Sequence, residues 1–332
     1  MSKQVINDLP ELLQAGVIDS ATLDRIRDYY GQRQPTEPGG RINLLFAIIG
    51  TLLVSLGIIL IVAHNWDDLS RTVKLFFSFM PLVVGQALCG FALYKKMDDL
   101  GFRESSAVFL FFAVGACLAL VSQLYHISET VGDIIFMWML TSFPLIYILR
   151  SSMVSLLYIC GITIYVFYEG YNRSYGQTYH YWWMLLLLIP HYLSLLTKRP
   201  QSNFTYFHHW LVPLSLTISL GSLASHSGEL LFVAYMSMFG AFYLLGTSHY
   251  FSKSKIFSNG YLVLGSLGTM CLLLAFSFRW IWEEVYQNRL SYNIFTSPEG
   301  WAAILLSLAA IVLLIRQLSN KPHNGYNYMG FI

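Results

Sequence analysis

The chain has 332 residues, of which 55% are hydrophobic and only 11% are charged, and its formal net charge is +2. Soluble domains carry about 25% charged residues, so this chain has too few charges to cover a water-exposed surface and must be solvated largely by lipid. The near-zero net charge and the lack of a basic stripe exclude a nucleic-acid partner. All four cysteines fall in apolar runs, which predicts small buried hydrophobes, with no disulfide, metal site or cofactor.

Residues 1–34 form the first predicted element, a polar segment with helical periodicity. Gly16 is a typical helix stop, and Asp19 is a typical N-cap for a second helix. The pattern predicts a cytoplasmic helical hairpin over residues 1–34, followed by a linker over residues 35–41. Because so few residues rarely fold alone, we expect the hairpin to need the membrane domain, a second copy of the chain or another partner.

From residue 42 the chain repeats an apolar run followed by a short polar break. Runs of about 20 apolar residues suit membrane-spanning helices, so we expect an all-α, polytopic helical bundle over residues 42–318 and a cytoplasmic tail over 319–332. The ten predicted spans are 42–63, 75–93, 107–124, 134–149, 152–168, 182–197, 210–225, 230–250, 259–278 and 301–318. Only Arg150 and Ser151 separate the fourth run from the fifth, which leaves open whether these are two full spans.

Lysine and arginine are distributed unevenly over the predicted loops. With the N-terminus placed inside, the inner segments hold fifteen of the 20 lysines and arginines, and the outer segments hold five. Cytoplasmic loops of membrane proteins carry such an excess, so the pattern supports ten spans with both termini in the cytoplasm. The predicted outer boundary also carries an aromatic belt, which comprises Trp66, Trp182, Trp183, Trp280, Trp282 and Trp301.

The first candidate site is the stretch AHNWDD, which ends the first predicted span. His64, Asn65, Trp66 and Asp67 place a proton acceptor, an amide, an aromatic ring and a carboxylate within one turn. Helix capping and anchoring in the headgroup region account for these residue types equally well. An imidazole beside the span would titrate near neutral pH, so recognition of a polar solute or a lipid headgroup is the functional interpretation.

A second candidate stretch lies at the same predicted level, at the outer end of the third span. Gln123, Tyr125 and His126 again offer an amide, an aromatic ring and an imidazole. If the first and third spans are neighbours, the two stretches converge on one binding site at the outer mouth. Interfacial anchoring is the alternative interpretation of these residues.

Inside the spans, other features bear on function. Pro81, Pro144, Pro190 and Pro213 can kink their helices, and kinked helices often border cavities. Small residues around Gly265 permit close helix contact. No charged residue lies in the middle of a span, which counts against ion-coupled transport and proton pumping.

The remaining histidines are interpreted more simply. The sequence 208–210, His-His-Trp, is expected to mark the inner membrane interface, and no histidine pair has the spacing of a metal-ligand motif. No motif of a hydrolase or a phosphate-binding loop is present, so no catalytic residue is predicted.

AHNWD after a glycine-rich span, preceded by the hairpin LLQAGVIDSATLDRI, resembles a family of bacterial polytopic membrane proteins known as domain of unknown function 2157. The resemblance covers the hairpin, the stretch GTLLVSLGIILIVAHNWDDLSRTVKL and, more loosely, SQLYHIS. It implies a multi-pass protein of the bacterial inner membrane with a cytoplasmic N-terminal segment. It implies no activity, because the family has none assigned.

Three functional hypotheses follow. The leading one is an uncoupled carrier, or a protein that binds a lipid or small solute, with its site at the outer mouth. The second is a membrane scaffold or sensor that acts through residues 1–34, which could also form a homo-oligomer. The third is a membrane enzyme for a lipid-linked substrate with His64 as the general base. Membrane lipids are expected partners under all three hypotheses.

Overall fold

The computed structural model describes residues 12–13, 15–32, 68–127, 130–171, 179–224, 228–251, 256–279, 282 and 297–320. The chain divides into two compact units, Met1–Ser70 and Arg71–Ile332. The predicted linker over 35–41, the predicted first span over 42–63 and the candidate residues His64, Asn65, Trp66 and Asp67 lie outside the described residues, as does most of the predicted tail.

In the first unit, helix α2 (Ser20–Gln32) follows a tight turn at Gly16. Gly16 has a φ of +67°, and its amide donates a hydrogen bond to the carbonyl of Leu13 (3.1 Å). Glycine adopts positive φ without a steric cost, so it ends the preceding helix. Asp19 then accepts a hydrogen bond from the amide of Thr22 (3.2 Å) and caps α2. The helix stop and the N-cap predicted from the sequence are both confirmed.

In the second unit, each predicted span from the second to the tenth coincides with a described helix or helix pair. These are α4 (Arg71–Lys95), α5 (Leu100–Tyr125), α6 (Val131–Ser142) with α7 (Pro144–Ile148), α8 (Ser152–Gly170), α9 (Tyr179–Lys198), α10 (Asn203–Gly221), α11 (Gly228–Gly246), α12 (Gly260–Phe276) and α14 (Pro298–Asn320). The short 3-10 helices η1 (His249–Phe251) and η2 (Ile256–Ser258) precede α12. All regular elements in the described residues are helical, as expected.

Five of the described helical segments are long and apolar enough to cross a membrane: Arg71–Lys95, Leu100–Tyr125, Val131–Ile148, Ser152–Gly170 and Pro298–Ser319. Two further apolar helices, Leu230–Gly246 and Gly260–Phe276, are shorter. The protein is therefore an all-α, multi-pass membrane protein. The number of ten spans stays a prediction.

The fourth predicted span is interrupted at Pro144. Proline has no amide hydrogen to donate to the preceding turn, so α6 ends at Ser142 and α7 begins at Pro144. After α7, Arg150 adopts a left-handed conformation with φ 48°, and Ser151 caps α8 by accepting a hydrogen bond from the amide of Val154 (3.2 Å). The fourth and fifth runs are thus separate helices with a tight turn between them.

Contacts between helices show that their directions alternate along the chain. Glu104 near the start of α5 bonds to the start of α8, so these two helices run parallel. Ser237 and Gln317 likewise tie α11 to α14 in parallel, through partners at Ser307 (2.8 Å) and Thr247 (3.0 Å). One predicted span lies between the two members of each parallel pair. Two helices separated by one span are expected to run in the same direction across a membrane.

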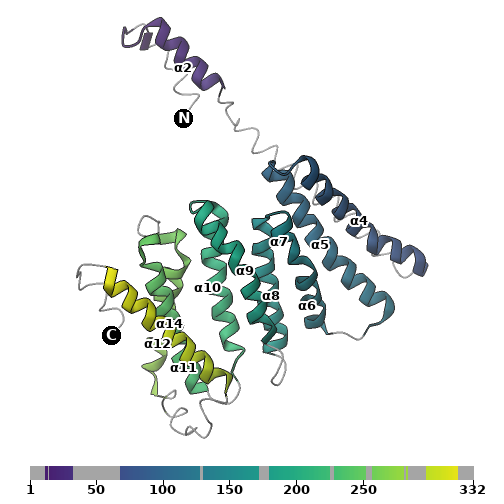
Figure 1. The fold of residues 1–332 in the computed structure, drawn as a ribbon, viewed down its shortest axis with the longest axis vertical. Helices are drawn as coiled ribbons and strands as arrows, with labels where there is room; N and C mark the ends of the chain where they lie inside the picture. The colour runs from purple at the N-terminus through teal and green to yellow at the C-terminus, as the bar shows by residue number, and fades with distance from the viewer. Residues whose placement is uncertain are drawn as a thin grey trace. The chain divides into compact units, whose positions relative to one another are not determined.

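Helices α8 and α10 occupy the middle of the second unit (Figure 1). Helix α8 contacts α5, α6, α7, α9 and α10, and α10 contacts α8, α9, α11 and α12. In the most apolar 18-residue stretch of α8, 56% of the residues are buried inside the protein. In the corresponding stretch of α14, only 6% are buried. Most of the exposed side chains on α14 are apolar, and they include Leu305, Leu308, Ile311, Val312 and Ile315. Such a surface suits lipid contact. The helices that are most enclosed by protein, and could therefore surround buried polar groups, are α8 and α10.

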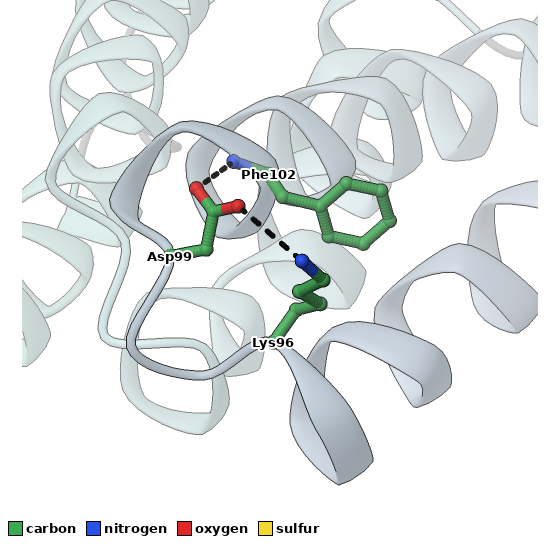
Figure 2. Close-up of polar contacts among 3 residues, drawn as sticks. All are labelled: Lys96, Asp99 and Phe102. Atoms are coloured by element: carbon green, nitrogen blue, oxygen red, sulfur yellow. Dashed lines mark hydrogen bonds and ion pairs between the residues drawn. The ribbon is translucent and has the colours of Figure 1, made fainter.

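The turn between α4 and α5 shows how a short polar break starts the next helix (Figure 2). Asp99 caps α5 by accepting a hydrogen bond from the amide of Phe102 (3.2 Å), and Lys96 lies 4.0 Å from the same carboxylate. The guanidinium of Arg103 donates a hydrogen bond to the carbonyl of Met97 (3.0 Å) and so also stabilises this turn. Both basic residues lie at the end that the sequence analysis assigns to the cytoplasm.

Close packing of α11 and α12 depends on glycine. A Cβ atom at Gly265 would lie 2.6 Å from the backbone nitrogen of Tyr243, and one at Gly268 would collide with the ring of Phe239. The small residues therefore permit the close helix contact that their spacing predicted.

Candidate functional site

Polar side chains gather at two opposite ends of helix α8 in the second unit. The Glu104 end comprises Glu104 and Ser151–Met153, where α5 and α8 begin. The Gln123 end comprises Gln123, Thr130 and Glu169, where α5 ends, α6 begins and α8 ends. In the predicted orientation, the Glu104 end faces the cytoplasm and the Gln123 end is the outer mouth.

Three predicted site residues, Gln123, Tyr125 and His126, lie together at the last turn of α5, and all three side chains are exposed. His126 adopts the left-handed conformation with φ 53°, and its amide donates to the carbonyl of Gln123 (3.4 Å). The next amide, of Ile127, donates to the carbonyl of Ser122 (3.1 Å). These bonds satisfy carbonyl groups at the helix end, so the backbone of His126 caps α5 independently of any role of its imidazole ring. Its convergence with His64 to Asp67 stays a prediction.

Beside these residues, Thr130 joins two carboxylates from different helices. Its hydroxyl lies 2.7 Å from Asp133 Oδ2 and 3.2 Å from Glu169 Oε1, and its amide and hydroxyl form a capping box with Asp133. Glu169 is only 5% exposed. Gly132 leaves the space for this carboxylate, since a Cβ there would collide with it. The Gln123 end thus gathers an amide, a phenol, an imidazole, a hydroxyl and two carboxylates.

At the opposite end, Glu104 holds the start of α8. Its carboxylate, 7% exposed, accepts hydrogen bonds from the amides of Ser152 and Met153 (both 3.0 Å) and from the hydroxyl of Ser151. The first amides of a helix have no partner within the helix, and they carry partial positive charge. A buried carboxylate at this position satisfies them and fixes α5 against α8.

One turn into α8 and α10, a buried histidine bridges the two helices. His208 is completely buried; its Nδ1 donates to the carbonyl of Phe204 (2.7 Å), and its Nε2 lies 2.7 Å from the hydroxyl of Ser155. Ser155 also lies 2.8 Å from the carbonyl of Ser152. The ring of Tyr192 on α9 stacks on the imidazole, with centroids 5.8 Å apart and an interplanar angle of 16°.

Two more histidines complete this cluster. His209 is 1% exposed, and its Nδ1 lies 2.8 Å from the hydroxyl of Tyr192, which lies 3.1 Å from the hydroxyl of Tyr261 on α12. The ring of His191 on α9 lies 6.3 Å from that of His208. His191 is 9% exposed, and its Nε2 has no hydrogen-bond partner in the part of the chain that the structure describes.

Farther along the same helices, buried hydroxyl groups continue the pattern. Ser215 on α10 lies 2.8 Å from the hydroxyl of Tyr181 and 2.6 Å from that of Thr163 on α8. Together with the histidine cluster they form what we call the polar stripe. Its members are Ser152, Ser155 and Thr163 of α8, Tyr181, His191 and Tyr192 of α9, His208, His209 and Ser215 of α10, and Tyr261 of α12.

The structure corrects one interpretation and adds residues that the sequence analysis missed. His208 and His209 were expected at the inner membrane interface, but both are buried inside the bundle, and only the neighbouring Trp210 is partly exposed. Glu104 and Glu169 were not recognised, because each lies just outside a predicted span. The signal that could have revealed the cluster is that His208 and Ser155 lie at similar distances from the starts of their helices.

Metal-binding chemistry finds no support in the described residues, where no group of three or more His, Cys, Asp or Glu side chains could hold an ion. The four cysteines are free, with Cys89 and Cys117 buried, Cys160 half-buried and Cys271 exposed. Cys89 donates a hydrogen bond to the carbonyl of Ser106 (3.3 Å) and so helps to pack α4 against α5.

The apolar helices and their lipid-suited surface define the class of this protein, a helical multi-pass membrane protein. Residues 10–155 match the model of the family described as "Predicted membrane protein (DUF2157)". The match includes the hairpin, the AHNWD stretch and SQLYHIS, so it confirms the resemblance on which the sequence analysis relied. No curated protein matches the chain. No solved structure matches it either.

Proposed function

We propose that this protein is a carrier, or a binding protein, for a small polar solute or a lipid headgroup, with its binding site at the Gln123 end. His64, Asn65, Trp66 and Asp67 would join Gln123, Tyr125 and His126 there. We further propose that it resides in the inner membrane of a bacterium, with the Glu104 end in the cytoplasm.

The observation that carries the proposal is the polar stripe along α8, α9 and α10. Polar side chains inside an apolar bundle are costly to bury and often mark a path for substrates or ions. The stripe runs beside α9 and α10, which contain Pro190 and Pro213, and proline-bent helices often border such paths. The hydrogen-bonded groups occupy both halves of α8 and α10, at Ser155–His208 and at Thr163–Ser215, so the stripe extends along most of their length.

The groups at the Gln123 end support the position of the site. Amide, phenol and imidazole groups are exposed there, and they can donate hydrogen bonds to a solute and accept them from it. A hydroxylated or cationic molecule would find both donors and acceptors in one place. The proposal therefore favours a hydrophilic ligand over an apolar one.

Native mass spectrometry with lipid and metabolite analysis of the protein purified in mild detergent tests this proposal. We expect the wild type to retain a specific small molecule or lipid that the double variant His64→Ala/Gln123→Ala loses. Gln86→Ala is the matched control, because it removes an exposed amide from the middle of α4. A ligand retained equally by all three proteins would show that the site is wrongly placed.

A second candidate function is a scaffold or sensor that acts through residues 1–34. The observation that favours it is the exposure of Leu12, Leu13 and Val17 in the hairpin, where Val17 is 68% exposed. Deleting residues 1–34 separates the two functions. A scaffold would lose its oligomeric state or its partner, whereas a carrier would keep the bound ligand.

A further inference from the structure

His208 lies at a point where a proton can be bound without breaking the hydrogen-bond network. Its Nδ1 faces the carbonyl oxygen of Phe204 at 2.7 Å. A carbonyl only accepts hydrogen bonds, so Nδ1 must carry a hydrogen. The neutral ring is therefore held as the Nδ1–H tautomer, and Nε2 is then an acceptor for the hydroxyl of Ser155 (2.7 Å).

Ser155 has a second acceptor within reach. Its hydroxyl lies 2.8 Å from the carbonyl of Ser152, but it has only one hydrogen to donate. While His208 is neutral, that hydrogen points to Nε2. When Nε2 binds a proton it becomes a donor, and the Ser155 hydroxyl rotates to donate to Ser152 and accepts from Nε2. The carbonyl of Ser152 also accepts a bond along α8 in either state.

Both charge states of the imidazole are therefore fully hydrogen-bonded inside the bundle. A buried histidine with a single fixed partner lacks this property, because one of its two states leaves a donor or an acceptor unsatisfied. The ring of Tyr192 stacks on one face of the imidazole, with centroids 5.8 Å apart.

Around this pair, the neighbouring helices also contribute titratable groups. Those that face the cluster are Tyr147 of α7, His191 and Tyr192 of α9, Tyr206 and His209 of α10, Tyr250 of η1, Tyr261 of α12 and Glu104 of α5. Glu104 is the one carboxylate among them, and it is connected to His208 through Ser152 and Ser155.

We infer that His208 and Ser155 form a buried proton-binding site, in which one proton adds to Nε2 while the Ser155 hydroxyl reverses its direction. This inference goes beyond the proposed carrier function and does not rest on it. Proton binding at this pair would occur whether or not a solute binds at the Gln123 end.

Nitrogen-15 NMR of the full-length protein in detergent, with labelled histidine rings, tests the inference directly. Between pH 8 and pH 4 we expect one buried histidine to change from the Nδ1–H tautomer to the imidazolium. His208→Gln should remove this signal, whereas His209→Gln and the exposed control His126→Gln should leave it in place.

Ser155→Ala keeps the bond from Nδ1 to Phe204 but removes the acceptor for the second N–H. The imidazolium loses a stronger hydrogen bond than the neutral ring does, so this variant should need a proton concentration roughly tenfold higher to form the imidazolium. Because Ser155→Ala also identifies the signal, the test stands even if His208→Gln does not fold. A buried histidine that stays neutral down to pH 4, that shows the Nε2–H tautomer, or that titrates identically in Ser155→Ala would overturn the inference.

Discussion

The Gln123 end and the histidine cluster near the Glu104 end contain the same residue types, but the side chains are exposed in the first and buried in the second. His126 is exposed and takes part in a helix end, whereas His208 is completely buried and bonded through both ring nitrogens. Solvent can satisfy any orientation of the first ring, but only the protein can satisfy the second. Exposure therefore suits the Gln123 end to recognition of a ligand from water, and burial suits the cluster to controlled binding of a proton.

The largest expected effect lies at the Glu104 end. Glu104→Ala removes the acceptor for two helix amides and the Ser151 hydroxyl, so we expect the free energy of unfolding to fall by about 3 kcal/mol. Glu104→Gln keeps one acceptor oxygen and should lose less. Thermal unfolding in detergent measures both. Equal stability of the wild type and Glu104→Ala would show that this carboxylate does not hold α8.

Two glycine substitutions compare packing at the two ends. In Gly260→Ala the new Cβ would lie 2.7 Å from Trp210 Cα and collide with the carbonyl of His209, so we expect a loss of about 1–3 kcal/mol in unfolding free energy. In Gly132→Ala the obstacle is the side chain of Glu169, which can rotate, so the loss should be smaller. The reverse order in a thermal unfolding assay would contradict the structure.

Two left-handed residues give a test with the opposite sign. Arg150 (φ 48°) and His126 (φ 53°) hold a conformation that glycine adopts without strain. Arg150→Gly and His126→Gly should therefore each raise the unfolding free energy by about 1 kcal/mol. If the proposed site is correct, His126→Gly will also lose bound ligand while Arg150→Gly keeps it, which separates the capping role from the binding role.

The smallest effect is expected in the N-terminal hairpin. Hydrogen bonds from Thr22 hold the pKa of Asp19 below its ordinary value of 3.8. The carboxylate therefore stabilises α2 above that pH, and the contribution is lost as the pH falls through the lowered pKa. Hydrogen exchange of α2 amides in Asp19→Ala should exceed that of the wild type at pH 7 and match it at pH 2. A difference that persists unchanged at pH 2 would contradict the capping role.

Much of this architecture was predictable because it depends on local sequence. The helix stop at Gly16 and the cap at Asp19 follow from single residues and their backbone preferences. Proline alone did not predict the break at Pro144, because Pro81, Pro190 and Pro213 lie inside continuous helices. The class of protein follows from composition, because so few charges leave lipid as the main solvent. The candidate residues Gln123, Tyr125 and His126 were found by their place at a span boundary, where they are indeed exposed.

The histidine cluster was not predictable in the same way, because its members come from four different helices, α8, α9, α10 and α12. Composition and periodicity place His208 near a helix start, which is also where interfacial residues lie. Whether such a residue faces lipid or protein depends on which helix packs beside it. The partner Ser155 is 53 residues away in the sequence, and no local pattern connects the two.

Hydropathy and local capping are enough to show that this chain is a helical membrane protein and roughly where the helices of its second unit lie. Only the tertiary structure decided that α8 and α10 are central and that Glu104, Ser155 and His208 lie together. The physical reason is that lipid contact and helix contact both favour apolar side chains, so hydropathy alone does not say which face of a helix is buried in protein.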